Sequence, residues 1–230
     1  MSIADNLLKY KNEIESQGVK LVAVSKNHPA EAVLEAYEAG QRVFGENLVQ
    51  EMVDKQAQLP ADIEWHLIGH LQTNKVKYIA PFIKLIESVD SLKLLKEIDK
   101  QAAKHQRVID CLLQIYIADE ESKFGLGFDE AIELLRSDEF AALKNVRIIG
   151  LMGIATNIAQ EKQISAEFNE LKVLFDGIKV SYFRQSDYFK EISMGMSSDY
   201  QLAIEEGSTM VRIGSNIFGK RVIKHWKNKE

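Results

Sequence analysis

The chain has 230 residues, of which 46% are hydrophobic and 27% charged, and its formal net charge is −5. This length suits a one-domain α/β barrel, whereas the mildly acidic charge argues against nucleic acid as a partner. No stretch reaches the ~18 uninterrupted apolar residues of a membrane span, and the charged N-terminus lacks an apolar signal core. We therefore expect a cytoplasmic protein with no membrane or nucleic-acid partner. The single cysteine, Cys111, excludes an internal disulfide and is expected to be a buried thiol.

Short apolar segments alternate with helical patterns along the chain. After an amphipathic N-terminal helix, strands are expected at 20–26, 42–46, 64–69, 83–90, 108–118, 146–155, 191–196 and 210–214. Helices are expected at 29–39, 47–58, from Thr73, and at 92–104, 129–137, 160–176 and 199–206. Several strands are continuous apolar runs, which is typical of parallel sheets that are covered on both faces. Eight such units predict a single (β/α)8 TIM barrel domain over residues 1–230. A doubly wound open sheet is the competing architecture, but no G-x-G-x-x-G loop follows the first strand.

Lys26 closes the apolar segment LVAVSK, at the end of the first predicted strand. In a barrel of this kind the chemistry lies at the carboxyl ends of the strands. Poor solvation there would lower the pKa of the amine and make it a better nucleophile toward an aldehyde. The alternative is a lysine that simply extends into solvent, and its position alone leaves both open.

Two turns rich in glycine and hydroxyl groups follow the seventh and eighth predicted strands, SMGMS at 193–197 and RIGSN at 212–216. The loops at these places form the usual phosphate site of this fold, and glycine lets the backbone approach a phosphate closely. Either turn alone could be an ordinary turn. Together with Lys26 they predict a site for a phosphorylated aldehyde.

Arg212 lies between apolar residues of the eighth strand, where a buried cation without a partner would be costly. We expect it to reach the mouth of the barrel and hold an anion or a ring nitrogen, and the alternative is an ion pair with a carboxylate such as Glu46. His66, beside Trp65, is expected to be a hydrogen-bonded core histidine. With His70 it lacks the third ligand that a metal site needs.

Seven segments carry a resemblance to a known family. They are AVSKNHP (23–29), FGENLVQE (44–51), WHLIGHLQTNK (65–75), ESKFGL (121–126), GLMGIA (150–155), SMGMSSDY (193–200) and GSTMVRIGSNIFGKR (207–221). In this order, over nearly the whole chain, the sequence resembles the YggS/PROSC family of pyridoxal 5′-phosphate (PLP)-binding proteins, also called the PLP homeostasis proteins. The AVSK segment and the last two segments are the most specific.

The resemblance implies a fold like the N-terminal domain of alanine racemase, without its second β-domain, and a Schiff base between PLP and Lys26. It implies that further residues surround the cofactor: Asn47, His66, Met152, Ser193, Met194, Gly195, Ser197, Arg212, Gly214 and Ser215. Arg212 is expected at either the phosphate or the pyridine nitrogen. Asn27 and His28 stand where the family often has Thr and Lys, and residues 153–156 vary the sixth-strand motif, so the mouth of the site is less well defined.

The resemblance also implies a role in intracellular PLP homeostasis, in which PLP is held without turnover. The sequence adds a reason: few residues follow the strand at 210–214, too few for a second domain that would supply an acid/base on the other face of a substrate. An open site also stays wet, which weakens electrostatic catalysis. The alternatives are a weak racemase whose base is His66 or Tyr200, and a cofactor-free aldolase that acts through Lys26.

Beyond PLP, we expect only a class of partner protein. The expected recipients are PLP-dependent apoenzymes, and the chain is expected to be a monomer. Lys123, in ESKFGL, is a candidate second acceptor for the aldehyde, with a solvated loop lysine as the other interpretation.

Overall fold

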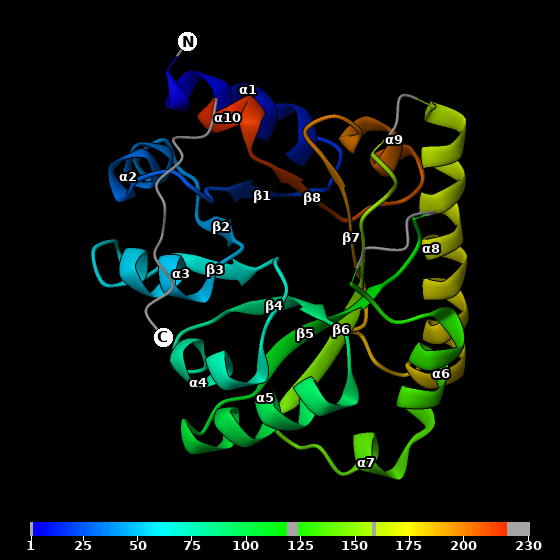
Figure 1. Ribbon diagram of the computed structural model, residues 1–230. Coiled ribbons are helices and arrows are strands. Elements are labelled where there is room, and N and C mark those ends of the chain that lie inside the picture. The colour runs from blue at the N-terminus through cyan, green and yellow to red at the C-terminus, as the bar shows by residue number, and fades with distance from the viewer. Residues whose placement is uncertain (1, 119–123, 158–159, 220–230) are drawn as a thin grey trace.

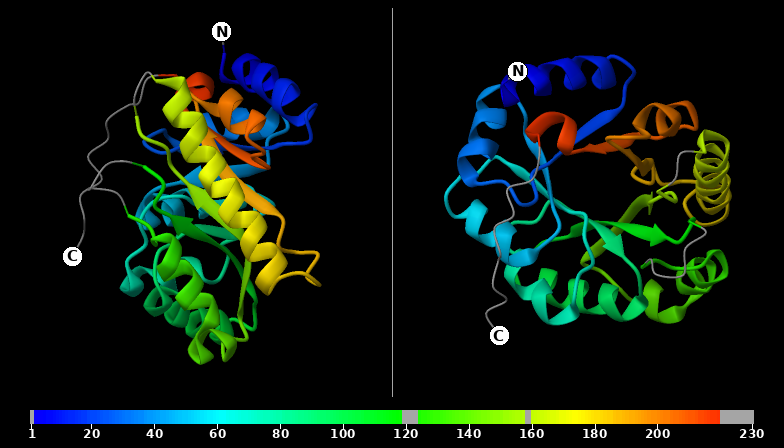
Figure 2. Two further views of the ribbon diagram at one scale, coloured as in Figure 1. Left: turned by 90° about the vertical axis from the view of Figure 1, so that its right-hand side faces the viewer. Right: turned by 45° about the horizontal axis from the view of Figure 1, so that its top comes forward.

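The computed structural model describes residues 2–118, 124–157 and 160–219. Eight parallel strands close into a barrel in sequence order, and helices surround it (Figures 1 and 2). The strands are β1 (Lys20–Val24), β2 (Val43–Glu46), β3 (Glu64–Leu67), β4 (Leu85–Val89), β5 (Ile109–Ile115), β6 (Val146–Gly153), β7 (Glu191–Met196) and β8 (Met210–Ile213). β1 pairs with β8 to close the ring. The predicted TIM barrel is confirmed.

The helices follow the predicted order with local differences. They are α1 (Ile3–Glu15), α2 (Ala30–Glu38), α3 (Val49–Gln56), α4 (Val76–Ile79), α5 (Leu92–Lys104), α6 (Phe128–Arg136), α7 (Asp138–Ala141), α8 (Glu161–Tyr182), α9 (Tyr200–Glu205) and α10 (Ser215–Phe218). The helix expected from Thr73 begins as a 3₁₀ turn, Thr73–Lys75. The short helices α7 and α10 were not predicted, because four residues carry too little periodicity to distinguish a helix from a loop.

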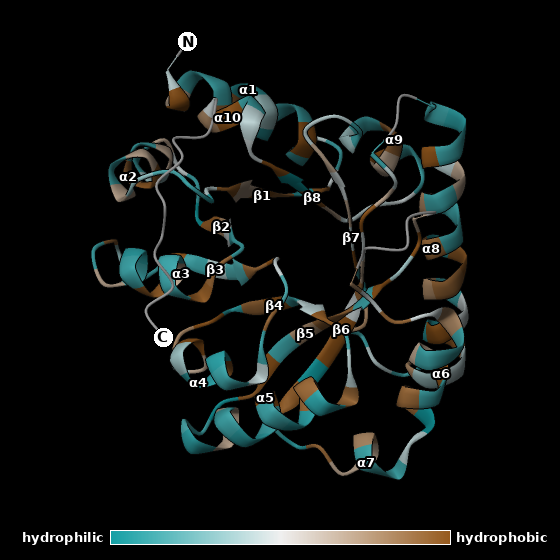
Figure 3. Ribbon diagram, viewed as in Figure 1, coloured by the Kyte–Doolittle hydropathy of each residue, from teal (hydrophilic) through white to brown (hydrophobic). Residues whose placement is uncertain are grey.

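Local signals explain why the longer helices begin where they do. Ser2 caps α1 in a reciprocal capping box with Asp5. The predicted cap at Ser91 is confirmed, since its hydroxyl accepts the backbone N–H of Leu94 at 3.3 Å. The helices carry both hydrophobic and hydrophilic stretches, and hydrophobic residues run through most of the strands (Figure 3). Hydrophobic burial therefore fixes which face of each helix meets the barrel.

The core has two layers. The larger layer lies between strands and helices, and it includes Cys111, which is fully buried as predicted. The smaller one fills the inside of the barrel, with a set of apolar side chains comprising Val22, Leu85, Leu112, Met152 and Met210. Because side chains alternate along a strand, Glu87 and Arg212 share the inward face with Leu85 and Met210. Inside the barrel, an apolar layer is therefore followed by a polar layer nearer the carboxyl ends of the strands.

Close packing between β6 and β7 depends on a glycine. A Cβ built at Gly150 would lie 1.7 Å from the backbone oxygen of Glu191, so no larger residue fits there.

Within the described residues, no helix is long and apolar enough to cross a membrane.

Candidate functional site

A cavity of about 310 Å³ opens at the carboxyl ends of the strands. The predicted site residues that line it are Lys26, Asn47, Ser197, Arg212, Gly214 and Ser215. The structure therefore brings together the amine that follows β1 and the hydroxyl-bearing turns that follow β7 and β8. Its walls also include Val24, Ile68 and Ile154, so one part of the cavity is apolar and suited to a planar ring.

The two turns that follow β7 and β8 are bound to each other. The backbone N–H of Gly214 donates to Oγ of Ser197 at 3.2 Å, and Nδ2 of Asn216 donates to the Ser197 carbonyl at 3.0 Å. A Cβ at Gly214 would lie 3.1 Å from the carbonyl oxygen of Val24, so glycine lets this turn sit against the end of β1. Three serines, Ser197, Ser198 and Ser215, line the cavity, and their residue type offers hydrogen-bonding groups of the kind that a phosphate needs.

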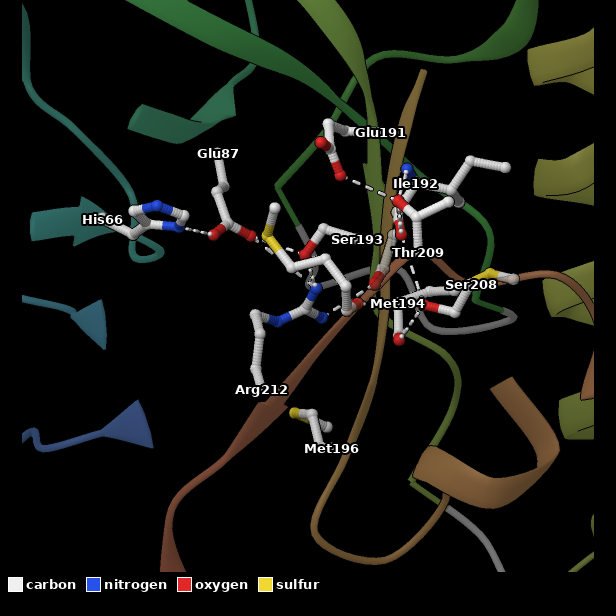
Figure 4. A network of polar contacts seen from close by, with 12 residues as sticks. His66, Glu87, Glu191, Ile192, Ser193, Met194, Met196, Ser208, Thr209 and Arg212 are labelled. Atoms are coloured by element: carbon white, nitrogen blue, oxygen red, sulfur yellow. Dashed lines mark hydrogen bonds and ion pairs between the residues drawn. The ribbon is translucent and has the colours of Figure 1, made fainter. Parts of the chain in front are cut away.

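Arg212 forms the floor of the cavity and is held by a buried polar network (Figure 4). Its Nη1 donates to Oγ of Ser193 at 2.6 Å and its Nη2 donates to the Gly153 carbonyl at 2.9 Å. Ser193 in turn donates to Oε2 of Glu87 at 2.6 Å, and the Arg212 guanidinium lies 4.0 Å from the same carboxylate. The alternative interpretation, an ion pair with a carboxylate such as Glu46, is right about the kind of partner and wrong about the residue. The carboxylate near Arg212 is Glu87, whereas Glu46 faces Ser25 and Lys55.

His66 completes this network from the other side of Glu87. Its Nδ1 lies 2.7 Å from Oε1 of Glu87, and the imidazole is 3% exposed. Burial alone raises the pKa of the Glu87 carboxyl, but His66, Arg212 and Ser193 together bring it below its ordinary value. Burial lowers the pKa of the Arg212 guanidinium, which Glu87 and Asp199 oppose. Glu87 is thus a carboxylate that balances a buried cation.

The other predicted site residues lie outside the cavity wall. His66 is the hydrogen-bonded core histidine that its position suggested, and Met152 belongs to the apolar layer inside the barrel. The Ser193 hydroxyl accepts a hydrogen bond from Arg212, whereas Met194 packs in the layer between strands and helices. Gly195 has a φ of 94°, which lets the strand turn toward Ser197.

Several residues of the site were missed by the sequence analysis. The cavity is also lined by His28, Ile154, Met196 and Ser198. Their positions depend on the geometry of the loops, which residue spacing in the sequence does not predict. Glu87 carried a usable signal, because it is the one charged residue between the hydrophobic residues of 85–89. A charge inside a continuous apolar strand indicates a buried partner.

A second cavity, of about 300 Å³, adjoins the first through Asn47, Ile68 and Ile154. His70 lines it, stacked on Phe124 with ring centroids 4.1 Å apart, and its Nδ1 lies 3.0 Å from Asp90. Among the residues that the structure describes, no three His, Cys, Asp or Glu side chains gather as a metal site would require. Lys123 lies outside the described residues.

Comparison with known proteins assigns the family. The model of the family "Alanine racemase, N-terminal domain" matches residues 1–222. The pyridoxal phosphate homeostasis protein of Aquifex aeolicus (strain VF5) is 40% identical over 203 residues, which cover 88% of this chain and 87% of the relative. That of Escherichia coli (strain K12) is 38% identical over 235 residues, covering 95% and 97%. The chain belongs to the pyridoxal phosphate homeostasis protein family.

Solved structures agree with this family membership. PipY of Synechococcus elongatus PCC7942, solved without PLP, superposes with a TM-score of 0.88 at 37% identity, over 95% of this chain and all of that one. The same protein with PLP bound superposes at 0.85. Alanine racemase of Clostridium difficile 630 has a TM-score of 0.69 at 16% identity, over 93% of this chain and 55% of that one, a likeness of fold alone. The resemblance of the homeostasis-family barrel to the racemase N-terminal domain is thereby confirmed.

Proposed function

We propose that this chain binds PLP as a Schiff base on Lys26 and serves PLP homeostasis without catalytic turnover, as one domain over residues 1–230. The observation that carries the proposal is a single cavity lined by Lys26 and by the hydroxyl-bearing residues Ser197 and Ser215. An aldehyde needs an amine nucleophile, and a phosphate needs hydrogen-bond donors. The PLP bound in PipY and the names of the relatives support the same ligand.

In the proposed complex, each end of PLP meets a different part of the cavity. Lys26 would supply the amine that condenses with the PLP aldehyde, with loss of water. Ser197, Gly214 and Ser215 would hold the phosphate, and Val24, Ile68 and Ile154 would cover the ring. Asn47 and Arg212 would supply polar contacts, with Arg212 fixed in place by Ser193 and Glu87.

The absence of turnover is supported by where the candidate bases lie. Tyr200 is directed to α1, where its hydroxyl donates to Glu13 at 2.7 Å. Burial and this carboxylate raise the pKa of the Tyr200 phenol. His66 is occupied by Glu87 beneath the cavity. Neither residue lines the cavity, so neither is placed to take a proton from a substrate held there.

The test is the visible absorption of the purified chain mixed with PLP, followed by borohydride reduction and peptide mass mapping. We expect a Schiff-base band, and reduction should leave the cofactor on the peptide that contains Lys26. The matched variants are Lys26→Ala, which should lose the band, and Lys123→Ala, which should keep it. A wild-type chain without the band would refute the proposal.

Homeostasis adds a second measurement, the transfer of PLP to an apoenzyme. The loaded chain, mixed with a PLP-dependent apoenzyme, should restore its activity. Turnover is tested separately by deuterium exchange at the α-carbon of added amino acids. Exchange that depends on Lys26 would favour the racemase alternative.

A further inference from the structure

The segment FGENLVQE contributes Asn47 to the cavity, but its two glutamates face the other way. Glu46 and Glu51 are both fully buried, and so is Lys55, one turn further along α3. Nζ of Lys55 lies 2.6 Å from Oε1 of Glu46 and 2.8 Å from Oε1 of Glu51. The three side chains form a buried ion cluster outside the proposed PLP site.

This cluster holds the backbone on both sides of Lys26. Before it, Lys55 donates to the Ser25 carbonyl at 2.8 Å, and the Ser25 hydroxyl donates to Glu46 at 2.6 Å. After it, the backbone N–H of Asn27 donates to Oε1 of Glu51 at 2.7 Å. Every contact therefore falls on a residue adjacent to the proposed Schiff-base lysine.

The turn after Lys26 has an uncommon backbone conformation, although asparagine adopts it more readily than most residues do. Asn27 has a φ of 63°, in the left-handed region that costs a residue with a side chain more than it costs glycine. Strained backbone of this kind persists where its surroundings over-determine it, and it gathers at functional sites. Three hydrogen bonds hold this turn in place: one from the Asn27 N–H to Glu51, and two that involve Ser25.

Stability alone does not explain why this cluster is ionic. Within the described residues, Oε2 of Glu46 and Oε2 of Glu51 are buried without a hydrogen-bond partner. Burial raises the pKa of Glu46 to about 7, against the opposing effect of Lys55. Buried ion clusters are often no more stable than apolar side chains of the same volume, and their best-supported use is to specify one arrangement.

We propose that Glu51 and Lys55 are positioning residues that hold the turn carrying Lys26, so that its amine meets the PLP aldehyde. This inference rests on the proposed Schiff base. Neither side chain lines the PLP cavity, so both act through the backbone of Ser25 and Asn27. The proposed phosphate contacts of Ser197, Gly214 and Ser215 come from the turns after β7 and β8, so they should not depend on Glu51 or Lys55.

That separation gives a test with two ligands. PLP needs the lysine, whereas its alcohol analogue pyridoxine 5′-phosphate has the same ring and phosphate but cannot form a C=N bond. We expect Glu51→Gln and Lys55→Met to slow Schiff-base formation and weaken PLP binding by about tenfold or more, because small misplacements of reacting groups have large effects on rate. Binding of pyridoxine 5′-phosphate, measured by equilibrium dialysis, should stay within about twofold of wild type.

A control variant on the same helix is Asp54→Asn, whose side chain pairs with Gln50 on the exposed side of α3. It should bind both ligands as wild type does. If a single variant fails to fold, the Glu46→Leu/Glu51→Leu/Lys55→Met variant replaces the cluster with apolar groups of similar size, which usually preserves stability. This folded variant should show the same selective loss of PLP binding.

Two results would overturn the inference. An equal loss of both ligands would mean that the cluster only maintains the fold. Unchanged PLP binding in a folded variant would mean that Lys26 needs no such support. A separate control tests the Schiff base itself. If wild type and Lys26→Ala bind PLP with the same affinity, no Schiff base forms on Lys26, and both proposals are overturned.

Discussion

Glu87→Gln removes the negative charge that lies 4.0 Å from Arg212 while keeping the shape of the side chain. At that distance, and at an effective dielectric constant of about 20, the lost attraction is roughly 4 kcal/mol. Part of it is offset because an amide costs less to bury than a carboxylate. Removing one partner of a buried pair typically costs about 3–5 kcal/mol, and we expect the lower end, about 3 kcal/mol of unfolding free energy at pH 7.

The assay is urea denaturation of apo protein, with thermal melting beside it. For a chain of this size, each 1 kcal/mol corresponds to about 2–4 °C, so the melting temperature should fall by about 6–12 °C. The matched control is Glu139→Gln, which removes the carboxylate of an exposed pair with Lys96 and should leave the midpoint unchanged. An unchanged midpoint for Glu87→Gln would refute the assignment of Glu87 as the carboxylate that balances Arg212.

The same variant carries a pH signature. The pKa of Glu87 is lower in the folded chain than in the unfolded chain, so its contribution is fully present above the unfolded pKa. It is lost as the pH falls through the folded pKa. The difference in stability between wild type and Glu87→Gln should therefore be constant near neutrality and shrink on acidification, below about pH 4.5.

The remaining predictions concern Gly195, Glu46 and Cys111. Gly195→Ala should destabilise the chain by about 2 kcal/mol or more in urea, because φ is 94° and its Cβ would lie 2.5 Å from that of Ala203; wild-type stability would refute this. The pKa of Glu46 is raised to about 7, so infrared spectra should show a protonated carboxyl that is lost between pH 6 and 8 and is absent in Glu46→Gln. The same raised pKa means that the Glu46 contribution to stability should fall as pH rises from about 4.5 to about 7, and the slope should be smaller in that variant. Cys111 is fully buried and burial raises the pKa of its thiol, so a thiol reagent should label it only in denaturant; rapid labelling of the native chain would contradict the burial.

The barrel could be predicted because its signals are local. Several strands are runs of apolar residues, and eight short strand-like segments alternate with helical patterns. The ends were less well defined: α8 continues to Tyr182, six residues beyond the predicted end at 176, because Ile178 still packs in the core. Gly177, directly after the predicted end, is typical of a helix C-terminus, but α8 runs through it.

The candidate site was predictable where the barrel topology determines direction. Lys26, Ser197 and Ser215 follow strand ends, and parallel strands end at the same face, so their meeting in one cavity follows from their positions. Met194 and Ser193 are adjacent on one strand, yet one faces the helices and the other the barrel interior. The direction of that alternation depends on the register at β7, where a shift lies between Ser193 and Met196.

By itself, the sequence determined the fold class, the family resemblance, and the strand ends from which the proposed PLP ligands come. Those properties depend on composition and on spacing along the chain. Only the tertiary structure decided which charged groups meet inside the barrel: Glu87 with Arg212 and His66, and Lys55 with Glu46 and Glu51. Glu87 and Arg212 are 125 residues apart in the sequence, and the closure of the barrel brings them together. The buried charges could not be left unpaired, but sequence spacing did not specify their partners.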